Sequence, residues 1–334
     1  MDEERLSPSD HGSDDGRGTL QYGIPPDGAR LPLDTRLGLV RLQVADLARS
    51  LSYYQDVLGL RLLETEGAEA VLGTSMAPDG DSAPLLELRE RVGAASVPRR
   101  ARLGLFHFAI LLPRRGDLGR FAGHLSARRE PVGASDHRVS EALYLHDPDG
   151  LGIEVYADRP RTAWRREGRQ LVMATDPLDV EDLLRAGEGA TWTGMPPGTV
   201  MGHMHLHVGD LARAEAFYHQ ALGLDKVVWS YPGALFLSAG GYHHHLGLNT
   251  WAAGAPPAGE ADARLLEWEL QVPSAEAAGA ALERLAGQGH PVEESPDGGT
   301  VPDPWGTVLR IRSARPDGAC RSPHSRRSFD SRES

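Results

Sequence analysis

Cysteine is almost absent from the sequence, whose 334 residues include one, Cys320. A single thiol excludes an intramolecular disulfide framework and is compatible with a reducing cytoplasm. Long apolar runs are also missing, because no stretch approaches the roughly 20 apolar residues that a membrane-spanning helix needs. No N-terminal segment joins a basic start to the apolar core of a signal peptide. These absences lead us to expect a cytoplasmic protein with no membrane partner.

Basic residues are fewer than acidic ones, at 35 against 47, which gives a net charge of -12. A net acidic field does not attract nucleic acid or an anionic membrane surface, so we expect neither as a partner. The composition is otherwise that of a globular protein, with 40% hydrophobic residues, and the length leaves room for about two domains. A small molecule is the expected ligand, and a homo-oligomer stays open.

Apolar residues are scarce at both ends of the chain. Residues 1–36 begin with an acidic stretch rich in Ser and Gly, and residues 314–334 are rich in Arg and Ser. Such segments bury too little apolar surface to offset the entropy lost on ordering. We predict a disordered tail at each end, and Cys320 lies in the second.

An internal repeat is the clearest positive feature. Two segments match in register at an offset of 164 residues, from Asp46 to Asp210: VADLARSLSYYQDVLGL at 44–60 and VGDLARAEAFYHQALGL at 208–224. Each copy follows an alternating strand pattern, has Asp where a helix N-cap is expected, and ends in the Leu-Gly pair typical of a helix stop. The chain therefore contains a duplication.

A second repeated pair lies between and after these copies, at 107–156 and 268–312. Both members read as strand, helix and strands, with an Asp-Pro-x-Gly turn before the last strand. The two repeats together predict an α+β fold of four βαβββ modules. These four modules are expected near residues 37–95, 103–158, 199–252 and 264–313.

The modular pattern resembles the vicinal oxygen chelate superfamily, which has the glyoxalase/bleomycin resistance/extradiol dioxygenase fold. Residues 136–154, DHRVSEALYLHDPDGLGIE, resemble the signature of type I extradiol ring-cleavage dioxygenases, except that Ser135 stands where that signature usually has Gly. Together with the segments GLFHFAILLP and GYHHHLGLN, this signature occurs in an order along the chain that is most similar to that of catechol 2,3-dioxygenases of the bacillus type.

The resemblance implies paired modules that form two half-barrel clefts. Along the chain it implies a first domain at 37–158, a linker at 159–198 and a second domain at 199–313. The implied activity is extradiol cleavage of catechol or a substituted catechol by dioxygen. The implied cofactor is one non-heme Fe(II) ion, with Mn(II) as the alternative, and the implied partners are a small aromatic diol and dioxygen.

Alternation along three strands predicts which side chains face a cleft, because residues two apart in a strand share a face. In GHMHLHV the histidines occupy one face and the apolar residues the other: His203, His205 and His207 against Met204, Leu206 and Val208. The same alternation places His107 in a cleft, with Phe106, Phe108 and Ile110 in the core. It places Glu154 opposite Ile153 and Val155.

Two histidines and one carboxylate leave open positions on a divalent metal such as Fe(II). Superfamily enzymes draw such ligands from the first and last strands of their modules. At those positions modules two and three have His107, Glu154 and His203, whereas modules one and four have Leu39, Glu267 and Arg310. We infer that modules two and three share the metal cleft. Modules one and four then pair as a structural barrel, in which Glu267 and Arg310 could form a salt bridge.

The run of three histidines, 243–245, resembles the histidine pair that ends module three in extradiol enzymes. This resemblance makes His244 the acid/base group, a role that suits imidazole because its ordinary pKa is near 6.5. His137 and Tyr144 match the His and Tyr of the signature and are further catalytic candidates. His205, His245 and Asn249 are candidate substrate contacts. The alternative for the run is an exposed polar loop, and adjacent strand residues point to opposite faces, so at most two of the three share one site.

Two other functions fit the same fold. One is a hydroquinone-type ring-cleavage dioxygenase or a glyoxalase-like metal isomerase, against which His137 and Tyr144 favour catechol cleavage. The other is a metal-free protein that binds small molecules, against which the joint presence of His107, Glu154 and His203 argues.

Overall fold

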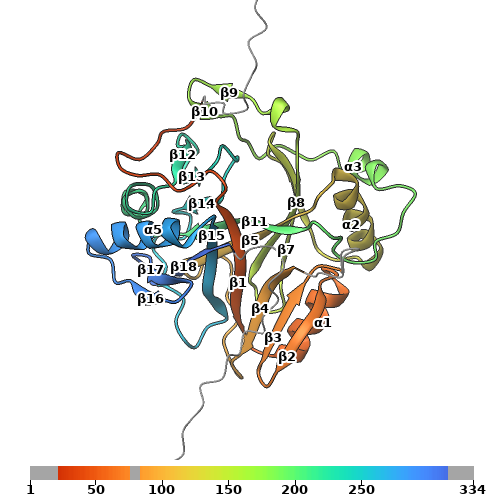
Figure 1. Cartoon of the computed structure of the whole chain (residues 1–334). Helices are drawn as coiled ribbons and strands as arrows, with labels where there is room; N and C mark the ends of the chain where they lie inside the picture. The colour runs from red at the N-terminus through yellow and green to blue at the C-terminus, as the bar shows by residue number, and fades with distance from the viewer. Residues whose placement is uncertain (1–21, 76–82, 315–334) are drawn as a thin grey trace, which may run out of the picture.

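The computed structural model describes residues 22–75 and 83–314 and consists of two curled eight-stranded sheets that form half-barrels (Figure 1). We call the first the outer-module sheet. In spatial order it contains β16 (Glu293–Ser295), β17 (Gly298–Pro302), β18 (Val308–Ser313), β15 (Arg264–Val272), β1 (Arg36–Val44), β4 (Pro84–Glu90), β3 (Glu69–Gly73) and β2 (Arg61–Glu66). We call the second the inner-module sheet. It contains β12 (Asp225–Val228), β13 (Ala234–Ser238), β14 (Leu246–Asn249), β11 (Val200–His207), β5 (Gly104–Leu111), β8 (Gly152–Asp158), β7 (Ser140–His146) and β6 (Gly133–Asp136).

Helices lie on the outside of the sheets, one within each module (Figure 1). They are α1 (Leu47–Asp56), α2 (Arg115–Arg128), α4 (Leu211–Ala214), which continues as the π-helix η2 (Glu215–Ala221), and α5 (Ala275–Gly287). Each module thus has the order strand, helix and three strands. The prediction of an α+β fold with four βαβββ modules is confirmed.

The modules pair out of chain order. Strands β1 and β15 run antiparallel and join modules one and four, whereas β5 and β11 run antiparallel and join modules two and three. In Figure 1 the strand nearest the N-terminus, β1, therefore lies beside the late strand β15. The predicted pairing of modules is confirmed, and each sheet takes strands from both segments 37–158 and 199–313.

The repeated helices begin and end as the sequence indicates. The carboxylates of Asp46 and Asp210 accept hydrogen bonds from the backbone N–H groups of Arg49 and Arg213, three residues on. These bonds satisfy donors that a helix N-terminus otherwise leaves unpaired. The two capping Asp residues therefore start α1 and α4 at equivalent points of the duplication.

The Asp-Pro-x-Gly turns link modules that are consecutive in the chain. Gly150 and Gly306 have φ of 85° and 87°, a region that glycine adopts without strain. Ahead of them, Asp147 and Asp303 accept hydrogen bonds from the buried hydroxyls of Tyr54, at 3.1 Å, and Tyr218, at 2.9 Å. Tyr54 and Tyr218 occupy the same position in the two copies of the duplicated helix. Each is therefore hydrogen-bonded to the Asp-Pro-x-Gly turn of the module that follows it in the chain.

A network of ion pairs lies in the outer-module sheet, at the position equivalent to that of the predicted metal site in the inner-module sheet. The guanidinium of Arg310 donates to both oxygens of Glu267, at 2.7 and 2.9 Å. Arg41 donates to Glu87 at 2.7 Å and also contacts Glu267. The predicted salt bridge is confirmed, and paired Arg and Glu side chains occupy this cleft.

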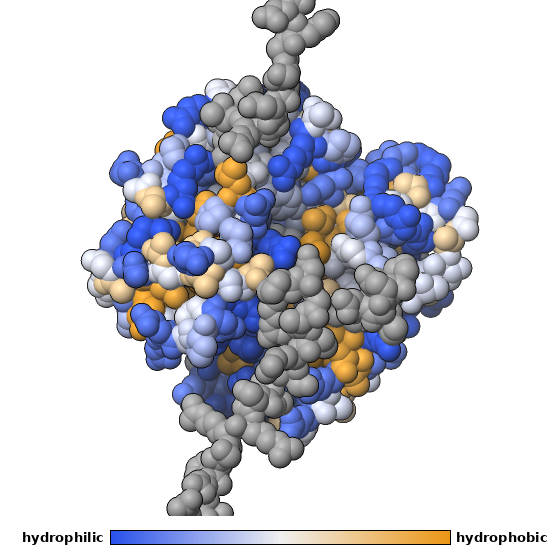
Figure 2. Space-filling model, in the orientation of Figure 1, coloured by the Kyte–Doolittle hydropathy of each residue, from blue (hydrophilic) through white to orange (hydrophobic). Residues whose placement is uncertain are grey.

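One continuous apolar core includes residues from both sheets and all four modules. On the face shown in Figure 2, hydrophobic residues are interspersed among hydrophilic ones. Among the described residues, no helix combines the length and the apolar character needed to cross a membrane.

The expectation of a disordered tail at 1–36 is wrong for residues 22–35. Ile24 forms a β-bridge with Lys226, and Leu31 is buried and donates its backbone N–H to the carbonyl of Gly223 at 2.9 Å. The few apolar residues of this segment pack on module three, which local composition does not reveal. Residues 1–21 and 315–334, with Cys320, lie outside the described residues.

The linker at 159–198 contains structure of its own. It has a short 3-10 turn at Arg161–Ala163, the small hairpin β9 (Arg166–Glu167) and β10 (Gln170–Leu171), and α3 (Val180–Ala186). Helix α3 packs against α2, and Gly119 allows the close approach, since a Cβ there would lie 2.2 Å from the carbonyl of Leu183. The linker is therefore a packed part of the inner-module half.

Candidate metal centre

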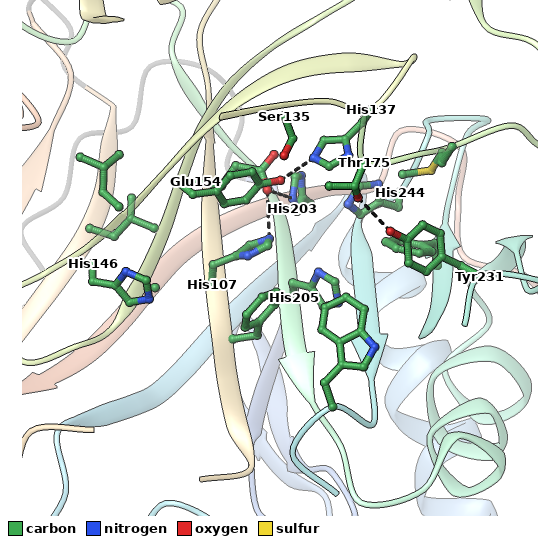
Figure 3. Close-up of a pocket in the computed structure, with 18 of the residues that line it drawn as sticks. His107, Ser135, His137, His146, Glu154, Thr175, His203, His205, Tyr231 and His244 are labelled. Atoms are coloured by element: carbon green, nitrogen blue, oxygen red, sulfur yellow. Dashed lines mark hydrogen bonds and ion pairs between the residues drawn. The ribbon is translucent and has the colours of Figure 1, made fainter. Parts of the chain in front are cut away.

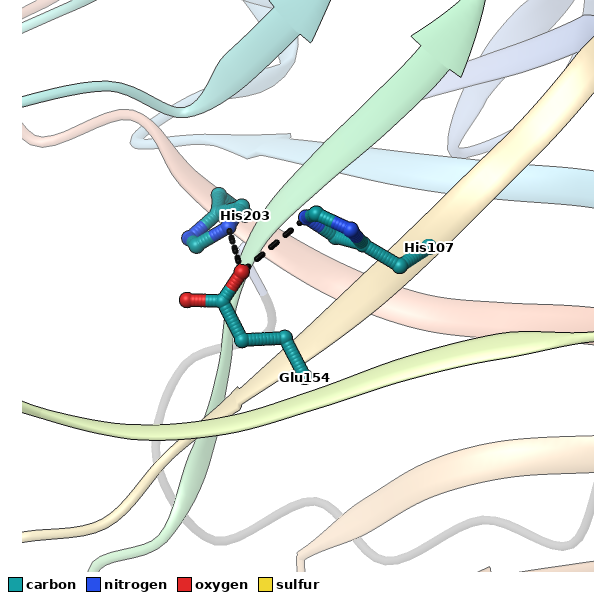
Figure 4. A group of neighbouring side chains, drawn as sticks. All are labelled: His107, Glu154 and His203. Carbon is teal, nitrogen blue, oxygen red and sulfur yellow. Dashed lines mark ion pairs between the residues drawn. The ribbon is translucent and has the colours of Figure 1, made fainter. Parts of the chain in front are cut away.

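Three neighbouring strands of the inner-module sheet bring His107, Glu154 and His203 together (Figure 4). Oε2 of Glu154 lies 3.1 Å from Nε2 of His107 and 3.4 Å from Nε2 of His203. All three side chains are buried, and their candidate ligand atoms lie within 4.8 Å of one another. They form a compact set that could hold a single metal ion.

Strand register explains this convergence. Ala109 of β5 pairs with Glu154 on the β8 side and with His203 on the β11 side. His107 is two residues earlier in β5, so its side chain shares the face of Ala109. The small side chain of Ala109 leaves room for three larger groups to meet above it.

The chemistry of these side chains fits a divalent cation. Nε2 of His107 faces Oε2 of Glu154 at 3.1 Å without the geometry of a hydrogen bond, and Nδ1 of His203 is buried without a hydrogen-bond partner. A buried polar group left unpaired costs about 1–3 kcal/mol. Burial lowers the pKa of His203 to about 4, which keeps the ring neutral. Burial alone would raise the pKa of Glu154, but His203 and His107 outweigh it and lower the pKa well below the usual value. The set therefore offers two imidazoles, of which that of His203 is neutral, and an anionic carboxylate, a suitable donor set for a metal with open positions.

A β-bulge at Gly202 sets the position of His203. The register of β11 against β5 shifts between Met201 and His203, so that Gly202 is the extra residue. A Cβ at Gly202 would lie 1.9 Å from the hydroxyl of Tyr156, which is buried and hydrogen-bonded to Tyr242 at 2.6 Å. Only glycine leaves space for this phenol beside the candidate metal centre.

Replacement of Gly202 by Ala is expected to destabilise the protein by about 1–3 kcal/mol, the usual cost of overpacking a core. The added methyl must displace Tyr156 or the strand that carries His203. Urea unfolding of the variant measures the change. Gly279 is the matched control, because a Cβ added there would have no atom within 4 Å, and an equally stable Gly202→Ala variant would contradict the expectation.

A second bulge reverses the predicted orientation of Phe106. The register passes from His107 opposite His205 to Leu105 opposite Leu206, so Phe106 is an extra residue in β5. Its ring lies 4.8 Å from that of His107 and lines the pocket instead of the core. Strict alternation was the basis of the prediction, and the bulge breaks it. Phe108 and Ile110 are in the core as predicted.

The three candidate ligands open into a pocket with a volume of about 340 Å³ (Figure 3), which lies within the usual range for small-molecule sites. Most of its wall is aromatic or apolar. The residues around the metal set are Phe106, Ser135, His137, Tyr144, Leu145, Ile153, Met173, Ala174, Thr175, His205, Tyr231, Phe236, His244 and Trp251, with Arg99 and His146 at the rim.

All three predicted catalytic residues, His244, His137 and Tyr144, line this pocket. Figure 3 labels His137 and His244 among its lining residues. The hydroxyl of Tyr144 is hydrogen-bonded to Nε2 of His137, and Nδ1 of His137 contacts the carbonyl of Ala174 at 2.6 Å. A carbonyl only accepts, so Nδ1 of His137 donates to Ala174. Burial, with the charge of Glu154, raises the pKa of Tyr144 well above its usual value, so this phenol keeps its proton.

Of the three predicted substrate contacts, one lines the pocket and two do not. His205 lines the pocket, and burial lowers its pKa well below the usual value. His245 and Asn249 do not line it: Nδ1 of His245 accepts from the backbone N–H of Ala239 at 3.2 Å, and Oδ1 of Asn249 accepts from Nδ1 of His207 at 2.6 Å. Neither residue lines the pocket and each pairs with protein groups, so substrate contact through them stays a prediction.

The run of three histidines is buried, so the alternative of an exposed loop is wrong. The run lies between β13 and β14, and of its members only His244 lines the pocket. Burial lowers the pKa of His244 well below its usual value. His243 points instead toward Asp158, and His245 toward Ser238. This divergence agrees with the limit that backbone alternation places on adjacent residues.

Several residues that line the pocket were not predicted from the sequence. Met173, Ala174 and Thr175 come from the linker, and Thr175 is hydrogen-bonded to the hydroxyl of Tyr231 at 2.8 Å. No local pattern marks these residues as functional. The one available signal was the length of the linker, since a long segment between compact modules is often functional.

Fold and site define a class of paired-module proteins with three side chains that could hold a metal ion, and comparison with known proteins agrees on the fold. Residues 36–155 and 200–309 match the Glyoxalase/Bleomycin resistance protein/Dioxygenase superfamily, and the chain belongs to this superfamily. It is 43% identical to the catechol-2,3-dioxygenase of Bacillus subtilis over 275 residues, which cover 81% of this chain and 94% of that protein.

Solved structures show the same fold. A crystal structure of a Bacillus subtilis protein has a TM-score of 0.57 at 15% identity, covering 86% of this chain and 87% of that one. The structure of glyoxalase I from Zea mays has a TM-score of 0.50 at 18% identity, with coverage of 84% and 92%.

Proposed function

We propose that this protein is an extradiol dioxygenase that cleaves the ring of catechol or a substituted catechol with dioxygen at a single Fe(II) ion. The observation that carries the proposal is the buried set of His107, Glu154 and His203, open to a pocket with His244, His137 and Tyr144 in its wall. The 43% identity to a catechol-2,3-dioxygenase supports this choice of reaction.

Ferrous iron held by these three residues would offer open positions to both catechol oxygens and to dioxygen, and would carry the electron transfer between them. The chain's own residues bind, orient and move protons. The rings of Phe106, Phe236 and Trp251 provide apolar walls against which an aromatic ring packs. Burial of the site also excludes water from the reacting groups.

His244 is suited to take a proton from the diol as it binds, because its ring is neutral and lines the pocket. The Tyr144 hydroxyl is hydrogen-bonded to Nε2 of His137, so these two residues form a fixed polar wall next to Glu154. This wall is suited to position the oxygens of the substrate.

The test is an assay of the purified full chain loaded anaerobically with Fe(II), given catechol and then oxygen. We expect uptake of one dioxygen per catechol and a yellow ring-opened product. Mass spectrometry then locates the cleaved bond, and cleavage outside the diol supports the extradiol assignment.

Two outcomes with iron-loaded protein would reject the proposal. One is full iron loading without oxygen uptake on catechol or on its alkyl- and halogen-substituted forms. The other is turnover of a hydroquinone or isomerisation of a hemithioacetal in place of catechol cleavage, which would indicate another reaction of the same fold. A protein that binds no divalent metal would instead be a small-molecule binding protein.

A further inference from the structure

We propose that Asp158 and His243 are positioning residues that fix the tautomer of His244, so that Nε2 of His244 is the proton-accepting atom in the pocket. This inference rests on the proposed function for its catalytic consequence, whereas the tautomer itself is a property of the protein. Neither Asp158 nor His243 lines the pocket.

Hydrogen bonds connect the three residues in a row. Nδ1 of His244 lies 2.8 Å from Nδ1 of His243, and Nε2 of His243 lies 2.8 Å from Oδ1 of Asp158. His243 is completely buried, and the side chain of Asp158 is 27% exposed. The row therefore runs from the pocket wall, through a buried ring, to a carboxylate that reaches solvent.

The direction of each hydrogen bond in the row follows from the role of the Asp158 carboxylate as an acceptor. Its Oδ1 also contacts the hydroxyl of Tyr242 at 3.2 Å, so one oxygen serves two partners. Burial raises the pKa of Tyr242 well above its usual value, which keeps the phenol protonated and able to donate. A carboxylate oxygen accepts hydrogen bonds, so both Tyr242 and His243 donate to Oδ1 of Asp158. Nε2 of His243 consequently carries a hydrogen.

With one N–H and one acceptor nitrogen on each imidazole ring, the remaining assignments follow. Because Nε2 of His243 donates, Nδ1 of His243 accepts. The facing Nδ1 of His244 must then donate, which leaves Nε2 of His244 as an acceptor. Since Nδ1 is occupied by His243 and the ring lines the pocket, Nε2 is the nitrogen available to a ligand.

The same row can carry the charge that His244 receives. When Nε2 of His244 takes a proton from the diol, the Nδ1 proton can pass to Nδ1 of His243. The Nε2 proton of His243 then passes to Asp158, so the net change is one proton moved from the substrate to the carboxylate. Reversal of these transfers returns a proton to the pocket for the acid step of ring cleavage.

A purely structural role for His243 is the alternative to exclude. Its ring lies 4.1 Å from that of Tyr242 and 5.3 Å from that of Trp164, so it also packs within an aromatic cluster. His243→Phe retains an aromatic ring for this packing and removes both nitrogens. The matched control is His219→Phe, which removes another buried imidazole, one bonded to the carbonyl of Leu224 and remote from the pocket lining.

The first test measures the tautomers directly. Nitrogen NMR of the full chain, labelled with ¹⁵N-histidine and loaded with diamagnetic Zn(II), distinguishes the protonated from the unprotonated nitrogen of each ring. We expect Nε2–H for His243 and Nδ1–H for His244. Finding Nε2–H on His244 would overturn the inference, and this result does not depend on whether the protein cleaves catechol.

The second test measures catalysis on iron-loaded protein. We expect His243→Phe to lower kcat about 10- to 100-fold, the range of outer-shell partners, with iron content retained and KM changed less than about twofold. Asp158→Ala should lower kcat similarly, and Asp158→Glu should recover part of it. The solvent deuterium isotope effect on kcat should rise in both impaired variants. If fully iron-loaded His243→Phe keeps the kcat and the isotope effect of the wild type, the relay is overturned. If the wild-type protein itself cleaves no catechol ring, the proposed function is rejected instead.

Discussion

Replacement of Glu154 by Ala is expected to remove most of the bound metal and to lower ring cleavage more than about 100-fold, beyond the loss typical of a residue that only supports a ligand. Glu154 is the only anion of the set, and its Oε2 faces both histidines at 3.1 and 3.4 Å. Without it, only two imidazoles remain. Metal analysis of the purified variant and the catechol assay measure the two effects. His107→Ala and His203→Ala should behave in the same way.

The duplication supplies a matched control for this experiment. Arg310 holds in the outer-module sheet the position that Glu154 holds in the inner-module sheet, and it pairs with Glu267. Arg310→Ala should reduce stability by about 1–3 kcal/mol, because it leaves the half-buried network one cation short. It should leave metal content unchanged. A Glu154→Ala variant with full metal content and wild-type turnover would remove Glu154 from the ligand set.

Replacement of His244 by Phe is expected to keep the metal but to lower turnover about 10²- to 10⁴-fold, the usual contribution of a positioned acid or base. His244 lines the pocket and its ring lies 4.1 Å from that of His203, yet it is not one of the three converging groups. Phe fills similar space without a nitrogen. Steady-state kinetics on protein of verified iron content measure the change in kcat.

His245 provides the comparison within the same run. Its ring is buried but bonds to Ser238 and Ala239 instead of lining the pocket. A His245 variant should therefore lose less turnover than the His244 variant. Equal turnover of His244→Phe and wild type at equal iron content would move the acid/base role to another pocket histidine, of which His137 is the first to test.

Local patterns were enough to predict the modules. Hydrophobic alternation, Asp46 and Asp210 at helix starts, and the Asp-Pro-x-Gly turns all depend on neighbouring residues. Comparison of the repeats then showed which modules combine His and Glu at the ligand positions and which have Leu, Glu and Arg there. That contrast was sufficient to predict the pairing of modules and the Glu267–Arg310 salt bridge.

The errors share one cause, which is contact between distant segments. Phe106 faces the pocket because β5 contains one more residue than β11 at that point, a mismatch that neither strand shows alone. Residues 22–35 pack on module three because a few apolar side chains find partners about 200 residues away.

The sequence by itself determined the four-module architecture and the side chains that could bind a metal. Strand alternation and the duplication are patterns within short segments, so they can be recognised without knowledge of the tertiary structure. Only the tertiary structure decided which atoms meet. It placed Ala109 between Glu154 and His203, added linker residues to the pocket, and directed His243 and His244 to different partners. These outcomes depend on strand register, bulges and side-chain packing, which are set by the free energy of the whole fold rather than by any one segment.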